Sequence, residues 1–216
     1  MKTSKVVSST SVDVLREIAA ADTVAAVWQR SVDEHVARQV AARLPRHTVE
    51  RGLLLWAHDH HARSLAPLVA ELEPSDGRDA ILADARLLLN RWFEIALVPH
   101  AYVSLAVVAD SSCHRLHVDR VGRRLLTTYV GAGTEWLDPD AAEAWRRDRC
   151  CWKPSSIERL ATGSVIIMKG CNESDDDGLV HRSPPLEPDA SPRLLLRICD
   201  GEYHLARAGL TARGRA

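Results

Sequence analysis

A histidine and an aspartate separated by one residue, His117 and Asp119, are the pair in this sequence best suited to metal chemistry. On a strand, residues two apart point to the same face, so both side chains can reach one ion. A third candidate ligand, His181, lies far along the chain in another short segment with strand character. Two imidazoles and one carboxylate on one face are typical of non-haem Fe(II) sites, and they leave coordination positions open. The spacing therefore predicts a metal site at His117, Asp119 and His181.

An arginine, Arg193, opens a predicted strand shortly after His181. A guanidinium can bind a carboxylate through two parallel hydrogen bonds, and a short oxoacid bound to a metal needs such a cation for its far carboxylate. The order His-x-Asp, His, Arg supplies both the metal and the anchor. Alternative anchors, and the alternative role of Arg193 in a surface ion pair, stay open; the other cationic candidates are Arg197, Arg182 and, more weakly, Lys169.

Four further polar or aromatic residues lie near the His-x-Asp pair. Tyr129 is predicted to hydrogen-bond a cosubstrate, or to be a core tyrosine with a satisfied hydroxyl. Arg124 is predicted to pair with a substrate acid or with a structural carboxylate. Thr134 and Trp136 follow a glycine turn and are candidates for the substrate mouth, with a core position as the alternative for Trp136. Strand alternation separates Thr127 and Tyr129 on one face from Arg124, Leu126 and Thr128 on the other, and it turns His114 away from His117.

Three other clusters have weaker chemical interpretations. In 58–61, His-Asp-His-His, two histidines one helical turn apart can clamp a metal, but we expect His61 to be packed and His58 and His60 to be solvated. The acidic run 173–177 is predicted to be a solvated loop, with a lid or a weak cation site as the alternatives. The five cysteines are odd in number and show no Cys-x-x-Cys pattern, so they indicate neither a disulfide framework nor a structural zinc site. The adjacent Cys150 and Cys151 are expected to be inert thiols, with a redox-active pair as the alternative.

The elements that must position these residues fall into two blocks. Apolar residues at helical spacing, with caps and prolines at the ends, predict helices over 11–21, 22–44, 48–72 and 78–97. From residue 102 the pattern alternates and predicts short strands at 102–108, 114–119, 123–130, 163–169, 179–183, 193–200 and 202–206, with one short helix over 138–148. The expected class is α+β: a helical region at 1–98 packed on a β-sandwich or jelly-roll core at 99–206, and a flexible tail at 207–216.

Beyond the ligands, two motifs support a resemblance. Residues 163–170, Gly-Ser-Val-Ile-Ile-Met-Lys-Gly, and the ending His181-Arg182-Ser183-Pro184-Pro185 with Arg193-Leu194 resemble the 2-oxoglutarate/Fe(II) oxygenase superfamily. A closer resemblance, over about residues 100–200, is to the bacterial family named domain of unknown function 1826; it rests on 113–119 (CHRLHVD), 124–129 (RLLTTY), 131–136 (GAGTEW), Lys169-Gly170, 181–185 (HRSPP) and 193–195 (RLL). Leu116 and Ala132 depart from that family's usual aromatic residue and proline.

The resemblance implies a double-stranded β-helix, a cupin-like jelly roll, holding Fe(II) at His117, Asp119 and His181 and 2-oxoglutarate at Arg193 and Tyr129. The implied activity is a hydroxylase-type dioxygenase acting on an unidentified small molecule or peptide. The family name implies no reaction of its own. Two alternatives stay open: a non-catalytic cupin-like protein that handles zinc or iron, which would need no carboxylate anchor, and a degenerate sandwich used for protein contacts.

Composition excludes several other classes. The net charge of −1 provides no field that would recruit nucleic acid or an anionic membrane. Behind the N-terminal lysines there is no long apolar run, so neither a signal peptide nor a membrane span is predicted, and we expect a cytoplasmic protein. The sequence carries no indication of the oligomeric state.

Overall fold

The computed structural model describes residues 4–110, 113–148, 157–171, 178–185, 191–201 and 205. In chain order the elements are β1 (Lys5–Ser9), the 3₁₀ helix η1 (Val12–Ala19), β2 (Thr23–Trp28), α1 (Glu34–Ala41), β3 (Val49–Trp56), η2 (Ala66–Val69), α2 (Asp76–Ala96), β4 (His100–Val108), β5 (Arg123–Val130), β6 (Glu135–Trp136), α3 (Pro139–Arg147), β7 (Glu158–Arg159), β8 (Val165–Lys169), β9 (His181–Arg182) and β10 (Arg193–Asp200).

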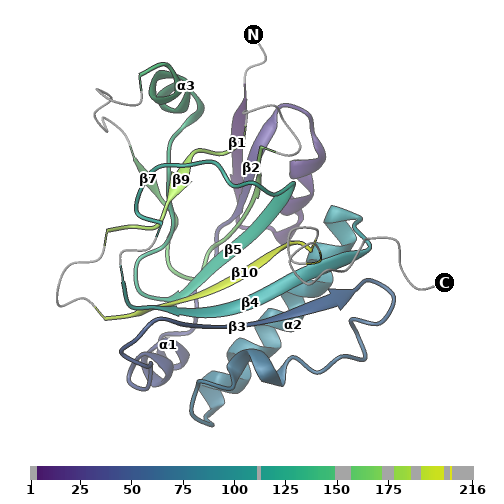
Figure 1. Ribbon diagram of the computed structural model, residues 1–216, viewed down its shortest axis with the longest axis vertical. Helices are drawn as coiled ribbons and strands as arrows, with labels where there is room; N and C mark the ends of the chain where they lie inside the picture. The colour runs from purple at the N-terminus through teal and green to yellow at the C-terminus, as the bar shows by residue number, and fades with distance from the viewer. Residues whose placement is uncertain are drawn as a thin grey trace.

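The strands form two sheets (Figure 1). The main sheet has seven strands in the order β1-β2-β8-β5-β10-β4-β3, and the minor sheet has three in the order β7-β6-β9. Only the β1–β2 pair is parallel; every other pair of described strands is antiparallel. An isolated bridge between His117 and His181 adds one more rung beside β9.

From β4 onward the chain alternates between the two sheets. β4 lies in the main sheet, the His117 bridge in the minor, β5 in the main, β6 and β7 in the minor, β8 in the main, β9 in the minor and β10 in the main. Chain neighbours therefore face each other across the interior, while the hydrogen-bonded pairs β4–β10 and β5–β8 join distant segments. This is the connectivity of a jelly roll, in which the two sheets enclose a site on their inner faces.

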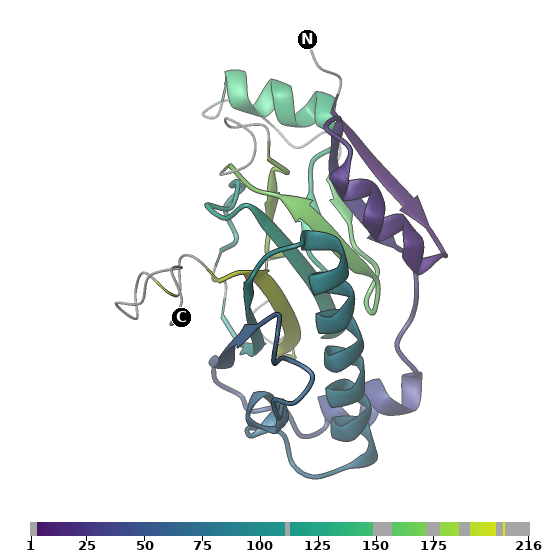
Figure 2. The same ribbon diagram turned by 90° about the vertical axis from the view of Figure 1, so that its right-hand side faces the viewer.

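Helices cover the outer faces of both sheets. α2 runs across the outer face of the main sheet and shares its largest apolar cluster, which includes Leu88 and Trp92 with Leu125 and Leu196 (Figures 1 and 2). α3 packs Ala142 and Trp145 against the minor sheet. The inner face of the main sheet has its own cluster; its members are Val24, Ala25, Val27, Leu126, Leu160, Ile166, Met168, Leu179 and Leu195.

Several sequence predictions are confirmed, because local signals determine those elements. Ser75 caps α2, its hydroxyl accepting from the Arg78 amide at 3.2 Å, and Leu97 ends the helix in the left-handed region at φ 52°. Asp138 caps α3, with Pro139 in the first turn. The predicted strands at 102–108, 123–130, 163–169 and 193–200 correspond to β4, β5, β8 and β10.

The helix predicted over 22–44 is wrong in its first part. Residues Thr23–Trp28 form β2, a strand between β1 and β8 in which five of six residues are buried. Val24 and Val27 join the inner-face cluster and Ala26 joins the outer, so both faces of this strand are covered by apolar groups. A short apolar run that is buried on both faces has no period of two, and it cannot be distinguished from a helix by spacing alone. Only α1 remains of that predicted helix.

The helix predicted over 48–72 is also wrong. Val49–Trp56 form β3, which pairs with β4 along its whole length, and only η2 is helical in the remainder. β1, β2 and β3 lie in the same sheet as β4, β5, β8 and β10, so strands from both sides of residue 98 share one sheet and the segment 1–98 is not a helical region.

The histidine cluster also differs from the expectation. It follows β3 in a turn rather than on a helix; His60 is buried, and His61 is exposed. His60 Nδ1 contacts the carbonyl oxygen of Ala57 at 2.8 Å, and its ring packs against that of Phe93 in a tilted arrangement, with centroids 4.4 Å apart. The prediction that His61 is packed and His60 is solvated is therefore reversed in the structure.

Other predictions fall partly or wholly outside the described residues. These are the acidic run 173–177, the pair Cys150 and Cys151, most of the strand at 202–206 and the tail at 207–216. The predicted strand at 114–119 is reduced to the single bridge at His117. No helix among the residues described has the length and apolar character needed to cross a membrane.

Candidate metal centre

The three predicted ligands, His117, Asp119 and His181, come together on the inner side of the minor sheet. His117 and His181 exchange both backbone hydrogen bonds, at 3.0 and 2.9 Å, so their side chains share one face. Their neighbours Leu116, Val118 and Val180 point the other way, into the cluster under α3. One ligand atom from each of the three residues lies within 4.8 Å of the others, and no other such group of histidine, cysteine or acidic side chains occurs in the described part of the chain.

Both imidazoles are held by backbone carbonyls through Nδ1. His117 Nδ1 lies 2.8 Å from the Arg115 oxygen, and His181 Nδ1 lies 3.0 Å from the Leu179 oxygen. Because a carbonyl only accepts, Nδ1 carries the hydrogen, and Nε2 of the neutral ring keeps its lone pair. This arrangement fixes the tautomer and the ring orientation of a histidine that ligates a metal. Both Nε2 atoms face Asp119, at 3.7 Å from Oδ1 for His117 and 3.3 Å from Oδ2 for His181.

The two oxygens of Asp119 have different surroundings. Oδ1 receives Arg124 Nη1 at 2.7 Å, whereas Oδ2 is buried without a hydrogen-bond partner among the described groups. Burial by itself raises the pKa of this carboxyl, but the two histidines and the Arg124 guanidinium outweigh it and hold the pKa far below its usual range. The same contact with Asp119 raises the pKa of His117 above 6.5. The cluster is thus an ionised carboxylate with one uncommitted oxygen beside two lone-pair nitrogens.

The backbone around Asp119 is tied to the end of β8. The Asp119 carbonyl accepts from Cys171 N at 2.9 Å, and the Gly122 carbonyl accepts from Gly170 N at 2.9 Å. A Cβ on Gly170 would lie 2.1 Å from the Val121 oxygen and 2.6 Å from the Asp119 oxygen. Glycine at this position therefore allows the ligand-bearing loop to lie directly against β8.

These features fit a divalent transition-metal ion. Two imidazole nitrogens and one carboxylate oxygen suit Fe(II) and also Zn(II), and the uncommitted Oδ2 is the kind of buried acceptor that a cation would satisfy.

Arg193, at the start of β10, is buried with 1% of its surface exposed. Its Nε donates to the Ala132 carbonyl at 2.6 Å, its Nη2 reaches Thr128 Oγ1 at 3.5 Å, and its Nη1 has no partner in the described structure. Burial lowers the pKa of the guanidinium to about 10, with partial compensation from the charge of Glu135. Arg193 therefore stays a cation at neutral pH, and no described carboxylate lies within ion-pair distance of it.

The alternative anchors are already engaged. Arg182 Nε donates to Glu135 at 2.7 Å, and Arg197 Nη2 donates to Glu50 at 2.5 Å. Lys169 Nζ donates to the Ala20 carbonyl at 2.7 Å. Arg193 is thus the one predicted anchor that has a buried donor left unused among the described residues.

Gly131 makes room for the Arg193 side chain. It adopts φ +84°, and a Cβ there would lie 2.8 Å from Arg193 Cγ. The turn 131–133 predicted from the sequence thus has two roles, because its Ala132 carbonyl also accepts from the guanidinium.

Arg193 and the three candidate ligands lie on the same side of the main sheet. Arg124 and Thr128 are four residues apart on β5 and share a face; one contacts Asp119 and the other Arg193. Four residues of strand span about 13 Å, a separation that two inward-reaching side chains and a short dicarboxylate can bridge. Leu126 lies between them, and Trp136, paired with His181, faces the same interior and packs on the inner-face cluster.

The remaining predicted pocket residues are placed as follows. Arg124 is bound to Asp119 rather than directed at an open space. Thr134 is buried, and its carbonyl accepts from Leu160 N at 2.9 Å. Thr128 was not singled out as a site residue, although strand alternation already put it on the face of Arg124.

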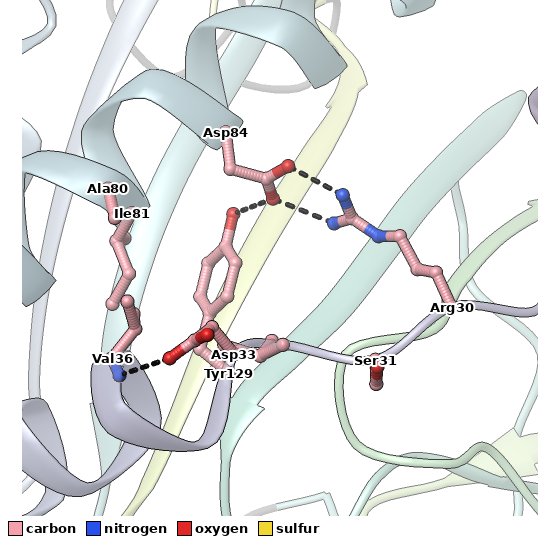
Figure 3. Close-up of a pocket in the computed structure, with 9 residues that line it drawn as sticks. Arg30, Ser31, Asp33, Val36, Ala80, Ile81, Asp84 and Tyr129 are labelled. Atoms are coloured by element: carbon pink, nitrogen blue, oxygen red, sulfur yellow. Dashed lines mark hydrogen bonds and ion pairs between the residues drawn. The ribbon is translucent and has the colours of Figure 1, made fainter.

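Tyr129 faces away from the three candidate ligands. Its hydroxyl donates to Asp84 Oδ2 on α2 at 2.7 Å, and Arg30 binds the same carboxylate through Nη1 and Nη2 at 2.5 and 2.7 Å (Figure 3). These groups line a small cavity of about 190 Å³ on the outer face of the sheet. This position argues against the predicted contact between Tyr129 and a cosubstrate; the alternative, a core tyrosine with a satisfied hydroxyl, describes it.

Comparison with family models identifies this chain. Residues 9–198 match the model described as "Protein of unknown function (DUF1826)", so the chain belongs to that family. The resemblance inferred from the sequence is confirmed, and the match includes the segment up to residue 100, where the sequence motifs were weak. A comparison with curated proteins found no match.

Solved structures similar to this chain include several described as oxygenases. A prolyl-4-hydroxylase from Pseudomonas putida is 11% identical, with 86% of this chain and 95% of that chain covered at a TM-score of 0.44. A putative oxygenase from Shewanella oneidensis is 13% identical, with 93% and 90% covered at 0.45. A putative 2OG-Fe(II) oxygenase family protein from Caulobacter crescentus is 12% identical, with 81% and 75% covered at 0.39. At this identity and TM-score the likeness assigns no activity to this chain.

Proposed function

We propose that this protein is a non-haem Fe(II)/2-oxoglutarate-dependent oxygenase that acts on a small molecule or a peptide. One combined observation supports the proposal: an uncommitted carboxylate oxygen with two lone-pair nitrogens, and a buried arginine without a carboxylate, on the same inner face of a jelly roll. The first group has an unused carboxylate oxygen and two lone pairs that suit a metal cation, and the second has an unused donor that suits an anion. A metal ion and a dicarboxylate would satisfy both.

In this proposal His117, Asp119 and His181 hold the metal. The contacts from Nδ1 to backbone carbonyls keep each Nε2 directed at the ion, and the low pKa of Asp119 keeps its carboxylate ionised without a proton to displace. When bound, Fe(II) and 2-oxoglutarate supply the O₂-dependent oxidation that defines this class of enzyme.

Arg193 would bind the carboxylate of 2-oxoglutarate that lies away from the metal. Its Nη1 is the free donor, and Thr128 Oγ1 is close enough to join the same site. Leaving a buried guanidinium without a counter-charge is costly, and an ion pair in the same place recovers much of that cost. The arginine thus provides affinity for a dianion and orients it toward the metal.

Apolar side chains between the three metal ligands and Arg193 would exclude water from the site. Leu126 and Leu195 line the inner face of the main sheet, and Trp136 approaches from the minor sheet beside His181. Exclusion of water strengthens the electrostatic contacts of the site and limits side reactions. Arg124 and Thr134 complete the set of inner residues, Arg124 through its bond to Asp119.

Anaerobic titration tests the proposal. Adding Fe(II) and then 2-oxoglutarate to the wild-type protein should produce a weak metal-to-ligand charge-transfer band in the visible, and Arg193→Gln should require far more 2-oxoglutarate to produce it. Arg197→Gln, on the same strand but paired with Glu50, is the matched control and should titrate like the wild type. Zn(II) binding without any response to 2-oxoglutarate would instead assign a metal-handling role.

A further inference from the structure

The pairing of Arg124 with only one oxygen of Asp119 has a consequence for the metal site. Arg124 Nη1 lies 2.7 Å from Oδ1, while Oδ2 lies 3.3 Å from His181 Nε2 and has no hydrogen-bond partner in the described structure. Both side chains are largely buried, with 21% and 9% of their surfaces exposed. The two oxygens of the Asp119 carboxylate therefore differ: Oδ1 is paired with Arg124, and Oδ2 is not hydrogen-bonded to any described group.

Arg124 and Asp119 are held in place by different strands of the main sheet. Arg124 belongs to β5, in the main sheet, whereas Asp119 belongs to the loop after the His117 bridge, whose backbone is tied to β8. The contact therefore ties the ligand-bearing loop to a second strand of the main sheet, β5, beside β8. Directly opposite Arg124 on β10 is Cys199, whose thiol has a pKa raised to about 11 by burial, so it presents no competing anion to the guanidinium.

Arg124 lies beside the carboxylate of a candidate metal ligand, Asp119, and the sequence left two roles open for it. The sequence suggested that Arg124 pairs either with a substrate acid or with a structural carboxylate, and the contact with Asp119 uses the guanidinium in the second way. A guanidinium beside a cation site also repels the cation, so charge alone would disfavour metal binding. What the contact provides in return is orientation of Asp119.

We infer that Arg124 is a positioning residue that holds Asp119 Oδ1 so that Asp119 offers a metal only Oδ2. This inference rests on the proposed metal site. An Asp119 free to rotate would bind through both oxygens and occupy one of the positions that a three-ligand site leaves open. Arg124 thereby keeps a position available for small ligands, and it does so without touching the ion or any substrate.

The test uses Mn(II) alone as the probe and measures water-proton relaxation, which reports how many exchangeable water molecules the bound ion carries. Arg124→Met should reduce that number by about a third, from three to two, because Asp119 then takes a second position. Arg124→Lys, which can still donate to Oδ1, should keep the wild-type value. The matched control is Arg123→Met: Arg123 is the adjacent arginine of β5, with its side chain on the opposite face and reaching the Ile95 carbonyl. It should also keep the wild-type value.

Thermal unfolding of each metal-free variant shows that it is folded before the Mn(II) measurement. An Arg124→Met protein with the wild-type water number would overturn the inference, as would an equal loss in Arg123→Met. Failure of the wild-type protein to bind Mn(II) at all is a separate result; it would refute the proposed metal site itself, whereas a normal wild-type titration with an unaffected Arg124→Met refutes only the role of Arg124.

Discussion

Two carboxylates, Asp84 and Asp119, lie on opposite sides of the main sheet, and each is bound by an arginine. Asp84 is complete: Arg30 occupies both of its oxygens, and Tyr129 adds a third hydrogen bond (Figure 3). Asp119 is only partly paired, because Arg124 donates to Oδ1, whereas Oδ2, which lies 3.3 Å from His181 Nε2, has no hydrogen-bond donor among the described groups.

The same contrast separates two arginines. Arg30 is fully used by Asp84, with a further bond from its Nε to the Gly163 carbonyl at 2.9 Å. Arg193 is more deeply buried, and yet its Nη1 has no acceptor in the described structure. Buried polar groups are nearly always satisfied in folded proteins, so the unused atoms of Asp119 and Arg193 are consistent with the ligands proposed above. Under that proposal Asp119 and Arg193 bind ligands, whereas Asp84 and Arg30 support the structure.

Replacing Asp119, the carboxylate with an unpaired oxygen, should have the largest effect of these substitutions, and the effect should be on metal affinity. Asp119→Asn is expected to weaken Mn(II) or Fe(II) binding by more than about 100-fold, because it removes the anionic ligand itself, which matters more than the groups behind it. The wild-type protein should unfold at a higher temperature when metal is added, and this increment should vanish in the variant. Asp84→Asn is the control; its unfolding temperature should still rise with metal. If the metal-induced rise in unfolding temperature vanished in both variants, Asp119 and Asp84 would not differ in metal binding.

Arg193→Gln is expected to weaken 2-oxoglutarate binding by about 100-fold, since truncating one partner of a buried charge pair costs on the order of 2–5 kcal/mol. Isothermal titration of the metal-loaded protein measures this, and metal affinity itself should stay within about twofold. If the affinity for 2-oxoglutarate were unchanged, Arg193 would have a structural role, as Arg30 does, and would not bind the cosubstrate.

Asp84→Asn is expected to lower the free energy of unfolding by about 2–3 kcal/mol. Breaking a buried pair costs somewhat more than this, and the pair is about one-fifth exposed, so solvent screening reduces the loss. Urea unfolding at pH 7 measures it. A neutral result would mean that the completed carboxylate is not a structural support.

Tyr129→Phe should have the smallest effect, about 1–2 kcal/mol at pH 7, from loss of a hydrogen bond to a charged acceptor. Burial and the neighbouring Asp84 raise the pKa of Tyr129 well above 10. The folded state thus retains a proton that the unfolded chain loses, and the stability due to this group falls as pH rises above 10. The difference in unfolding free energy between wild type and Tyr129→Phe should therefore be constant below about pH 10 and shrink as the pH rises above it; absence of this trend would place the hydroxyl elsewhere.

The sequence predicted the elements whose signals are local. α2 and α3 carry caps, and β4, β5, β8 and β10 carry alternating or continuous apolar runs between turn residues. β2 and β3 were missed because their neighbours in the sheet, not their own spacing, make them strands. Sheet pairing at such positions outweighs local preference.

The candidate site was predictable in part for a related reason. The spacing of His117 and Asp119 predicted a shared face, and the structure brings His181 and Arg124 to them. The alternation along β5 was enough to show that Tyr129 could not share a site with Arg124. The contacts of Asp84 with Arg30 and of Arg193 with Thr128 had no sequence signal, since the fold alone brings these distant residues together.

A crystal structure of the protein grown with Mn(II) and 2-oxoglutarate, with the ion located by its anomalous scattering, tests the proposed site most directly. We expect one anomalous peak within about 2.3 Å of His117 Nε2, His181 Nε2 and Asp119 Oδ2, and a carboxylate of 2-oxoglutarate on Arg193. A peak at Asp84, a peak at 58–61, or no ordered ion at the three inner residues would contradict it.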